Sequence, residues 1–139
     1  MRKLLTIVFA LCCSFFITAC GDSNAATAYE KAAVEISQAI YSGKSDKVKS
    51  MLYFSKEDLA EPGLKEMAGG KIEAATHDAK NKADSYGGLK QVTGVESEVN
   101  ESGDRARVTV LAEFKNDPEA QIRDNYNLVK EGSSWKLKL

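Results

Sequence analysis

The spacing of apolar residues changes once along this chain, from a helical period to an alternating one. From residue 27 to about residue 86, apolar side chains recur every three or four positions, and from residue 89 they alternate with polar ones. The first pattern is typical of helices that bury one face, and the second is typical of strands that bury one face. The sequence therefore predicts helices in the first half of the chain and a sheet in the second half.

The first helix is predicted to begin at Thr27. Thr27 and Glu30 have the spacing of a capping box, in which each side chain accepts a hydrogen bond from the backbone N–H of the other residue. Gly43 is well placed to end the helix, because glycine adopts the left-handed conformation that closes many helices. The apolar residues between these two ends fall on one side of the helix: Tyr29, Ala32, Ala33, Ile36 and Ile40.

Two short helices and one long helix are predicted next. The short ones start at Ser45 or Asp46 and at Ser55, and Pro62 ends the second, because a proline disfavours helix for the residue before it. The long helix carries a stripe rich in alanine: Leu64, Ala68, Ile72, Ala75, Ala79, Ala83 and Tyr86. Gly69-Gly70 lies inside it and predicts a kink or a break, because each glycine costs about 1 kcal/mol of helix propensity.

Four strands are predicted after the helices. They cover residues 89–99, 106–114, about 122–128 and 135–139, with polar turns between them. The second strand has the most regular alternation: Ala106, Val108, Val110, Ala112 and Phe114. Helices followed by an antiparallel meander predict an α+β fold, in which N-terminal helices pack on one face of a four-strand antiparallel sheet.

Residues 1–19 have the composition of a secretory signal. Arg2 and Lys3 precede sixteen residues, Leu4 to Ala19, that are apolar except for Thr6, Ser14 and Thr18. Such a run is too short for a comfortable membrane span, which needs about 20 apolar residues. We therefore predict that this segment is removed from the mature chain.

The end of this segment resembles the bacterial lipobox. Ile17-Thr18-Ala19-Cys20 has a branched apolar residue, a small residue, alanine and then cysteine, and neither Cys12 nor Cys13 follows a small residue. The resemblance implies that the chain is cleaved before Cys20. It also implies that Cys20 carries lipid, palmitate included, on both its thiol and its new amine. An ordinary cleaved signal with an incidental cysteine is the alternative.

The lipoprotein interpretation predicts three segments of the chain and a cellular location. Residues 1–19 are the signal peptide, residues 20–26 are the lipidated cysteine with a short tether, and residues 27–139 form a single domain. The tether would hold the domain close to the bilayer. In enteric bacteria an aspartate directly after the lipidated cysteine retains a lipoprotein in the inner membrane. Gly21 stands at that position here, which favours a cell-envelope protein of the outer membrane that faces the periplasm.

Charge and cysteine content exclude several classes of protein. Loss of Arg2 and Lys3 with the signal leaves 17 basic and 20 acidic residues, a net charge of −3, which does not favour a nucleic-acid partner. Cys20 is the one cysteine left, so no disulfide and no cysteine cluster for a metal can form. His77 is the single histidine, and its position predicts an outward side chain about 140° around the helix from Ile72. We predict no metal and no cofactor.

Three stretches resemble a family of small bacterial lipoproteins. They are Tyr41-Ser42-Gly43-Lys44-Ser45-Asp46 after the first helix, Gly103 to Val110 with the order G-D-x-A-x-V-x-V, and the closing Leu128 to Leu137. Together they resemble the nuclear transport factor 2-like (NTF2-like, or cystatin-like) superfamily, in a group of unknown function also called lumazine-binding-like. The resemblance implies a curved sheet wrapped by helices into a cone with an apolar pocket, and it implies no particular reaction.

The residues predicted to line such a pocket are Tyr53, Phe114, Tyr126 and Trp135. The alternative is that these aromatic side chains belong to the hydrophobic core and line no pocket. Asp124 alternates in register with Ile122 and Tyr126, so it could point into the core. A buried aspartate has a raised pKa and can act as a base. The alternative for Asp124 is a bulge or an edge position in contact with water.

The opposite face of the sheet is predicted to be basic. Two groups of charged residues are predicted on this face. The seven basic residues are Lys90, Arg105, Arg107, Lys115, Arg123, Lys136 and Lys138, and the four acidic residues are Glu96, Glu98, Glu113 and Glu131. A solvated face with weak cross-strand ion pairs is one interpretation. The other is a surface that docks on anionic lipid or on an acidic protein, with Arg105, Arg107, Arg123, Lys136 and Lys138 as its candidate residues.

Three functions remain open from sequence. The favoured one is a membrane-anchored, non-catalytic envelope lipoprotein that binds a small apolar ligand or an envelope protein. The alternatives are a cone-type hydrolase or isomerase with a carboxylate in the pocket, and a structural subunit of an envelope complex. The stretch Glu98 to Ser102 also resembles an acidic bacterial glycosylation site at Asn100.

Overall fold

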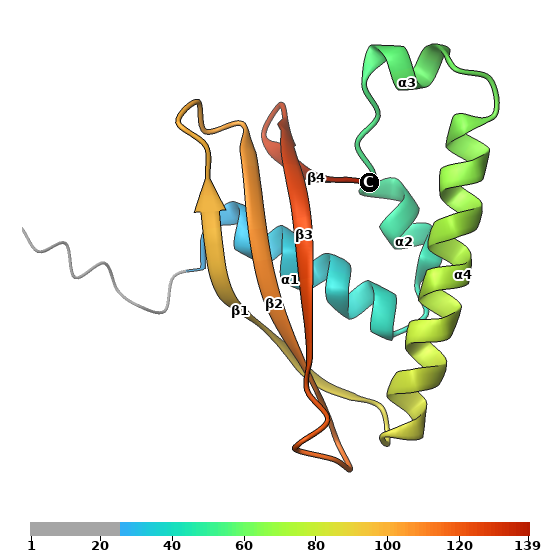
Figure 1. Cartoon of the computed structure of the whole chain (residues 1–139), viewed down its shortest axis with the longest axis vertical. Helices are drawn as coiled ribbons and strands as arrows, with labels where there is room; N and C mark the ends of the chain where they lie inside the picture. The colour runs from blue at the N-terminus through green and yellow to red at the C-terminus, as the bar shows by residue number, and fades with distance from the viewer. Residues whose placement is uncertain (1–25) are drawn as a thin grey trace, which may run out of the picture.

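The structure is a computed structural model that describes residues 26–139. The predicted signal segment and Cys20 lie outside the described residues. The elements are α1 (Ala28–Tyr41), α2 (Ser45–Ser50), α3 (Lys56–Ala60), α4 (Leu64–Ser85), β1 (Leu89–Val99), β2 (Arg105–Phe114), β3 (Ile122–Glu131) and β4 (Ser134–Lys138). Helices precede strands (Figure 1), so the predicted α+β class is confirmed. Within residues 26–139, no helix has both the length and the apolar character needed to cross a membrane.

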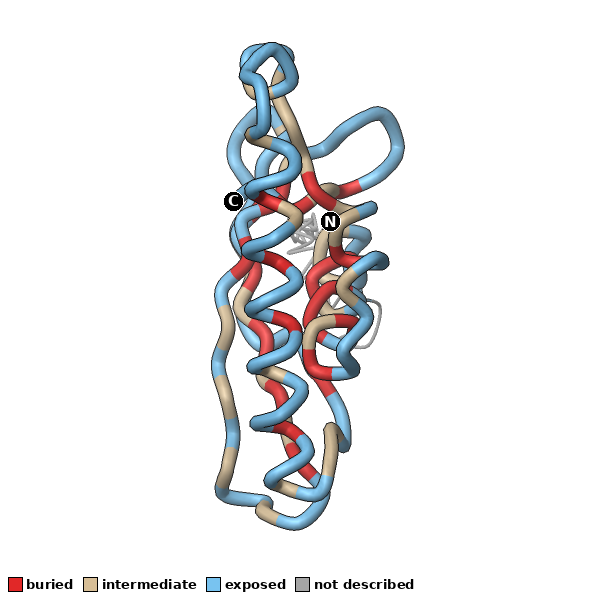
Figure 2. The backbone as a smooth tube through the Cα atoms, turned by 90° about the vertical axis from the view of Figure 1, so that its right-hand side faces the viewer, coloured by how far each residue is buried: buried red, intermediate tan, exposed pale blue. Residues whose placement is uncertain are grey.

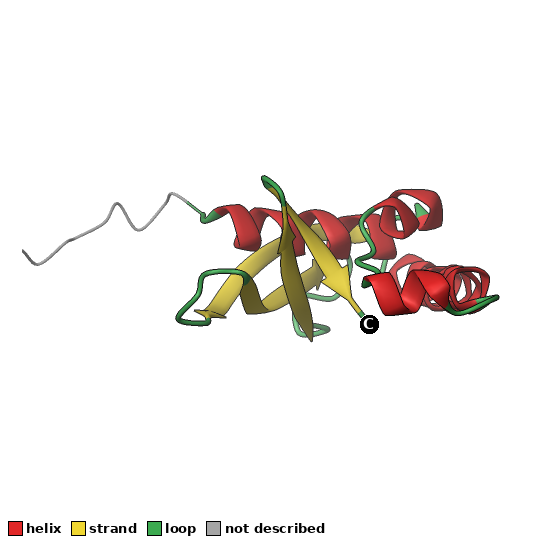
Figure 3. Ribbon diagram, turned by 90° about the horizontal axis from the view of Figure 1, so that it is seen from above, coloured by secondary structure: helices red, strands yellow, loops and turns green. Residues whose placement is uncertain are grey.

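The sheet is an antiparallel meander in the order β1-β2-β3-β4. The register places Val108 opposite Tyr126 and Leu128 opposite Leu137, so the buried positions of neighbouring strands share one face. α1 crosses this face and contacts all four strands, while the other face carries no helix (Figure 3). The predicted alternation in β2 is confirmed, because its five inward side chains are all buried.

The core lies mainly between α1 and the sheet. Ile36 and Ala33 of α1 are fully buried against Val108 and Val110 of β2, and all four belong to one apolar cluster. α4 packs on α1 and α2 and stands beside the sheet. Single buried residues recur along α4, whereas α3 has no buried residue (Figure 2). The helical half of the molecule therefore forms two layers, of which only α1 covers the sheet.

The capping box predicted for α1 is present, and α3 has a second one. Thr27 and Glu30 cap α1, and Ser55 and Asp58 cap α3, with reciprocal hydrogen bonds in each box. The carboxylate of Glu30 also accepts a hydrogen bond of 2.6 Å from the hydroxyl of Ser97 in β1. That bond is the main reason why the pKa of Glu30 lies below its usual value. The start of α1 is thereby fixed to the sheet as well as capped.

Of the kink or break predicted at Gly69-Gly70, the break is wrong. α4 runs without interruption from Leu64 to Ser85, because Ala68 and Ile72 pack into the core on either side of the two glycines. Tertiary packing of this kind outweighs weak local propensity. The predicted stripe is wrong at one position, since Thr76 is buried in place of Ala75, which is exposed.

The alternation predicted for β1 fails at Val95. The register shifts between Gly94 and Glu96, so an extra residue is inserted there as in a β-bulge. Val95 has no partner in the register and is 39% exposed. Beyond the bulge, Ser97 pairs with Val108 and therefore lies on the side of α1.

The segment after α2 is joined to the edge of β4. The N–H of Tyr53 donates to the carbonyl of Leu137 over 2.7 Å, and the N–H of Leu137 donates to the carbonyl of Met51 over 2.7 Å. Leu52 forms an isolated parallel bridge with Leu137. The ammonium of Lys136 donates to the carbonyl of Ser50 over 3.0 Å. We call these contacts the β4 clasp; they tie the helical half to the last strand.

Candidate functional site

The uncovered face of the sheet carries rows of polar side chains. One row runs across all four strands, because Glu98 pairs with Arg107, Arg107 with Asn127, and Asn127 with Lys138. All four of these residues are exposed. The neighbouring row contains Arg105, Val129 and Lys136. Alternation along the strands, which buries Val108 and Leu128 on the other face, is what turns these residues outward.

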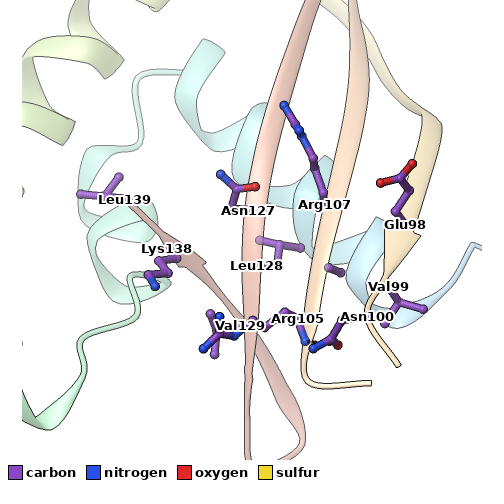
Figure 4. Close-up of a pocket in the computed structure, with 11 residues that line it drawn as sticks. Glu98, Val99, Asn100, Arg105, Arg107, Asn127, Leu128, Val129, Lys138 and Leu139 are labelled. Carbon is purple, nitrogen blue, oxygen red and sulfur yellow. Dashed lines mark hydrogen bonds between the residues drawn. The ribbon is translucent and has the colours of Figure 1, made fainter. Parts of the chain in front are cut away.

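This face is hollowed into a groove of about 510 Å³, which we call the Arg107 groove. Its labelled residues come from β1, β2, β3 and the end of β4 (Figure 4). The lining is Glu98, Val99, Asn100, Arg105, Ala106, Arg107, Asn127, Leu128, Val129, Lys138 and Leu139. A second groove of about 550 Å³, lined by Glu96, Ser97, Glu98, Arg107, Thr109 and Asn125, shares Glu98 and Arg107 with the first. Arg107 thus stands between two adjoining grooves.

The charged residues of the Arg107 groove are three cations and one acid. Arg105, Arg107 and Lys138 outnumber Glu98, which gives the groove a net charge of +2. Within the described part of the chain, none of these three cations forms an ion pair within 4 Å. Their charges are therefore available to a ligand, and the amide of Asn127 adds a hydrogen-bonding group to the same groove.

The structure separates the other two predicted docking residues from this group. Arg123 lies on the open face but pairs with Glu96 at 3.5 Å. Lys136 reaches away to the carbonyl of Ser50, at the end of α2, where a positive charge is favourable next to the helix dipole. Of the five predicted docking residues, Arg105, Arg107 and Lys138 come together in one groove.

Asp124 lies on the covered side of the sheet and is half-buried. Its carboxylate accepts a hydrogen bond of 2.8 Å from the hydroxyl of Tyr41, which comes from the end of α1. Burial, helped by this bond and by the charge of Asp124, raises the pKa of the Tyr41 hydroxyl far above its ordinary value. Tyr41 therefore remains a proton donor to Asp124 at neutral pH.

Tyr126 extends this polar cluster toward α1. Burial raises the pKa of its hydroxyl, and the charge of Asp124 adds to the effect, while the nearby hydroxyl of Ser37 opposes it. Ser37 is fully buried and its oxygen makes no hydrogen bond of normal geometry within residues 26–139. Tyr41, Asp124, Tyr126 and Ser37 thus place one carboxylate and three hydroxyls beneath the sheet, and the sequence pointed only to Asp124 and Tyr126.

The predicted pocket aromatics do not share one cavity. Phe114 packs edge-on against Tyr41, and Trp135 packs edge-on against Tyr29, with ring centres 5.6 and 5.4 Å apart. Phe114, Tyr126 and Trp135 are all buried members of the core. Tyr53 instead lines a groove of about 230 Å³, which we call the Met67 groove. The residues that line it are Tyr53, Phe54, Asp58, Leu64, Met67, Ala68, Lys71, Lys138 and Leu139.

The remaining polar candidates are His77 and Asn100. The side chain of His77 is 74% exposed on α4, as its position relative to the buried stripe predicts. Asn100 sits in the β1–β2 turn, and its amide is held by hydrogen bonds to Ser102 and Asp104. Within the described residues, no group of three His, Cys, Asp or Glu side chains is placed to hold a metal.

The fold has relatives among solved structures. A Campylobacter jejuni protein provisionally named an NTF2-like transpeptidase matches with a TM-score of 0.71 and 26% sequence identity, over 81% of this chain and 99% of that chain. The intermembrane-space region of the chloroplast protein ARC6 matches with a TM-score of 0.39 and 14% identity, over 83% of this chain and 95% of that chain, a likeness too distant to support an argument. No curated protein matches the chain. The first match confirms the NTF2-like fold that the three sequence stretches predict.

A family match covers nearly all of the chain, from the predicted lipobox to the end of β4. It spans residues 18–138 and therefore includes every helix and strand described above. The protein belongs to the family described as Domain of unknown function (DUF4878).

Proposed function

We propose that this protein is a lipid-anchored, non-catalytic binding module of the bacterial cell envelope, and that the Arg107 groove holds an acidic segment of a protein partner. The lipobox-like sequence that ends at Cys20 supports the anchor. Gly21 after Cys20 favours the periplasmic side of the outer membrane over the inner membrane. The short tether keeps the domain within reach of other envelope proteins.

One observation carries the binding proposal: Arg105, Arg107 and Lys138 converge on one groove and form no ion pair within the described residues. Guanidinium groups bind carboxylates through two parallel hydrogen bonds, which gives them geometric specificity for acidic side chains. Each exposed charge pair contributes only about 0–1 kcal/mol in water. Binding through this groove should therefore be modest and sensitive to salt.

A protein segment fits this groove better than a lipid surface does. The open face also carries Glu96, Glu98, Glu113 and Glu131, and a flat anionic membrane would press against these acids as well as against the bases. An extended segment can lie inside a concave groove and place its carboxylates at the three cations alone. The mature net charge of −3 likewise does not favour a nucleic-acid partner.

The test is to reverse Arg105, Arg107 and Lys138 to Glu in the mature chain held in lipid nanodiscs. The probe is a fluorescein-labelled peptide of alternating Asp and Glu, followed by fluorescence anisotropy at low and high salt. We expect the native chain to bind and to lose affinity at high salt, because screening acts over about 8 Å at physiological salt. The reversed chain should not bind.

The matched control reverses Lys31, Lys65 and Lys82. These exposed lysines also form no ion pair within 4 Å among the described residues, so the change of charge is the same. The control should bind as the native chain does. Equal binding by the native and groove-reversed chains, or binding that salt does not weaken, would contradict the proposal.

A second candidate is acid–base catalysis by Asp124, and the observation that favours it is the 2.8 Å hydrogen bond from Tyr41. The provisional name of the Campylobacter jejuni protein suggests transfer between peptides, a reaction that usually proceeds through an activated serine or cysteine nucleophile. Residues 21–139 contain no cysteine, and Ser37, the serine beside Tyr126, is fully buried. Loss of a peptide-transfer activity in a stably folded Asp124→Asn chain would support catalysis; the proposed binding module predicts no such activity.

A further inference from the structure

The Met67 groove is the apolar counterpart of the Arg107 groove. Six of its nine lining residues are apolar: Tyr53, Phe54, Leu64, Met67, Ala68 and Leu139. Met67 is 52% exposed and Leu139 is 65% exposed. They line the same groove, whereas exposed apolar residues that carry no function are usually scattered singly. α3, which borders the groove, buries no residue and leaves Leu59 62% exposed. This end of the molecule thus presents an apolar surface that nothing in the described chain covers.

The two grooves meet at the end of β4. Lys138 and Leu139 line both of them. The ammonium of Lys138 also lies near Asp58 of α3, whose pKa is lowered first by its hydrogen bonds with Ser55 and to a smaller extent by Lys138. A segment that leaves the Arg107 groove past Lys138 therefore enters the Met67 groove directly.

Size and charge indicate what the Met67 groove can hold. Its volume of about 230 Å³ is below the range of about 300–1,000 Å³ that is usual for pockets holding whole ligands, but it suits one or two side chains, like the pockets that hold the central residues of protein interfaces. Lys71 and Lys138 against Asp58 give its rim a net charge of +1. Met67 has a flexible, polarizable side chain that adapts to different apolar partners.

We propose that the Met67 groove binds a bulky apolar side chain that directly adjoins the acidic stretch of the partner segment. The inference rests on the proposed function, because the acidic stretch is the part held by the Arg107 groove. The partner is thereby defined by its chemistry: a run of Asp and Glu next to Leu, Phe or Trp. The acidic run gives orientation and salt-sensitive attraction, and the apolar residue gives burial that salt does not screen.

Three fluorescein-labelled peptides test this on the mature chain in lipid nanodiscs. One joins an acidic run to Leu-Trp, one joins the same run to Ser-Ser, and one joins a neutral Ser-Gly run to Leu-Trp, each made with the apolar end first and last. We expect the acidic-apolar peptide, in one chain direction, to bind about tenfold or more tightly than either of the others. Each factor of ten corresponds to about 1.4 kcal/mol.

Variants locate the effect. Met67→Ser should reduce the affinity for the acidic-apolar peptide to that for the acidic-Ser peptide. It should leave the affinity for the acidic-Ser peptide unchanged, because Met67 is outside the lining of the Arg107 groove. Val95→Ser is the matched control, because Val95 is an exposed apolar residue on β1 outside both grooves. It should change neither affinity. The Met67 side chain is more than half exposed, so we expect Met67→Ser to melt as the native chain does.

The methionines provide a direct readout. The chain has three, and the mature chain keeps Met51 and Met67. With ¹³C-labelled methyl groups, the Met67 signal should shift when the acidic-apolar peptide binds, while the signal of Met51, which is outside the groove lining, should stay in place.

The outcomes separate the two proposals. If the acidic-Ser peptide binds and the apolar addition changes nothing, the Met67 groove is not an anchor site and the proposed function stands. If the neutral Leu-Trp peptide binds as tightly as the acidic-apolar one, the joint use of the grooves is refuted. If none of the three peptides binds, both proposals fail.

Discussion

Neighbouring outward side chains on one strand have different roles in this protein: some make contacts within the fold and others line a groove. Lys136 and Lys138 are two residues apart on β4, yet the first holds the carbonyl of Ser50 and the second lines both grooves. Sequence alternation assigns both to the same face and does so correctly. It does not show that Lys136 has a fixed partner, because Ser50 lies 86 residues away along the chain.

The Tyr41–Asp124 pair leads to a prediction about alkaline pH. The pKa values of Tyr41 and Tyr126 are raised above the ordinary value of 10.0 in the folded protein. A group with a raised folded pKa binds more protons in the folded state than in the unfolded one, so its stabilising effect is full below pH 10 and is lost as pH rises above it. The free energy of unfolding should therefore fall above about pH 10.

Tyr41→Phe tests the contribution of one phenol. Above about pH 10 the slope of unfolding free energy against pH should become less steep by about 1.4 kcal/mol per pH unit, the value for one proton. Denaturant unfolding at a series of pH values gives the slope. Tyr53→Phe removes the same atom from a residue outside this pair and is the control for the loss of one hydroxyl. An unchanged slope for Tyr41→Phe would show that Tyr41 ionises freely in the folded state.

At the scale of elements, the period of the apolar pattern, together with helix start and stop signals such as Ser55 and Pro62, predicted every helix and strand of the described region. It failed where packing acts across elements: at Gly69-Gly70, where the neighbours of the glycines are buried, and at Val95, where a bulge shifts the register. The apolar period also did not predict the grooves. The Met67 groove joins residues of α3 and α4 to Leu139, and periodicity within one element carries no information about such a distant neighbour.

Gly70 in α4 predicts a gain in stability. A Cβ atom added there meets nothing within 4 Å, and alanine is favoured over glycine in a helix by about 1 kcal/mol. Gly70→Ala should therefore raise the free energy of unfolding by about 0.5–1 kcal/mol, measured by denaturant unfolding.

Gly63 is the contrasting position for this test. It also has open space around it, but its φ of 80° disfavours a side chain, so Gly63→Ala should lower stability. A loss of stability in Gly70→Ala would mean that the helix is strained at the two glycines after all.

For the whole molecule, the resemblance of three short stretches to the NTF2-like superfamily is confirmed as a fold by a solved structure with a TM-score of 0.71. Beneath the sheet, Asp124 is accompanied by the hydroxyls of Tyr41, Tyr126 and Ser37, and the Met67 groove lies elsewhere, between α3, α4 and the end of β4. The three sequence stretches predict neither feature, because most of the side chains involved lie outside those stretches.

Membrane attachment is the prediction that belongs to the whole chain. Cys20→Ala should abolish palmitate labelling and leave either an uncut precursor or protein released from membranes, because only Cys20 follows a small residue. Membrane fractionation with metabolic labelling measures both effects. Cys13→Ala is the matched control and should be processed and labelled normally. Continued labelling of Cys20→Ala would refute the lipid anchor.

The β4 clasp also sets the order in which the protein can fold. The contacts of Leu137 with Met51 and Tyr53 span more than eighty residues, and closing such long loops makes folding slow. α1, α4 and the β1–β2 hairpin are local and can form early, but the segment after α2 has no strand to join until β4 has docked on β3. A chain halted before β4 would therefore hold its helices and a three-strand sheet with two open edges, and such edges pair readily with other chains. The last strand thus completes the fold and covers the edge of β3, which would otherwise stay open.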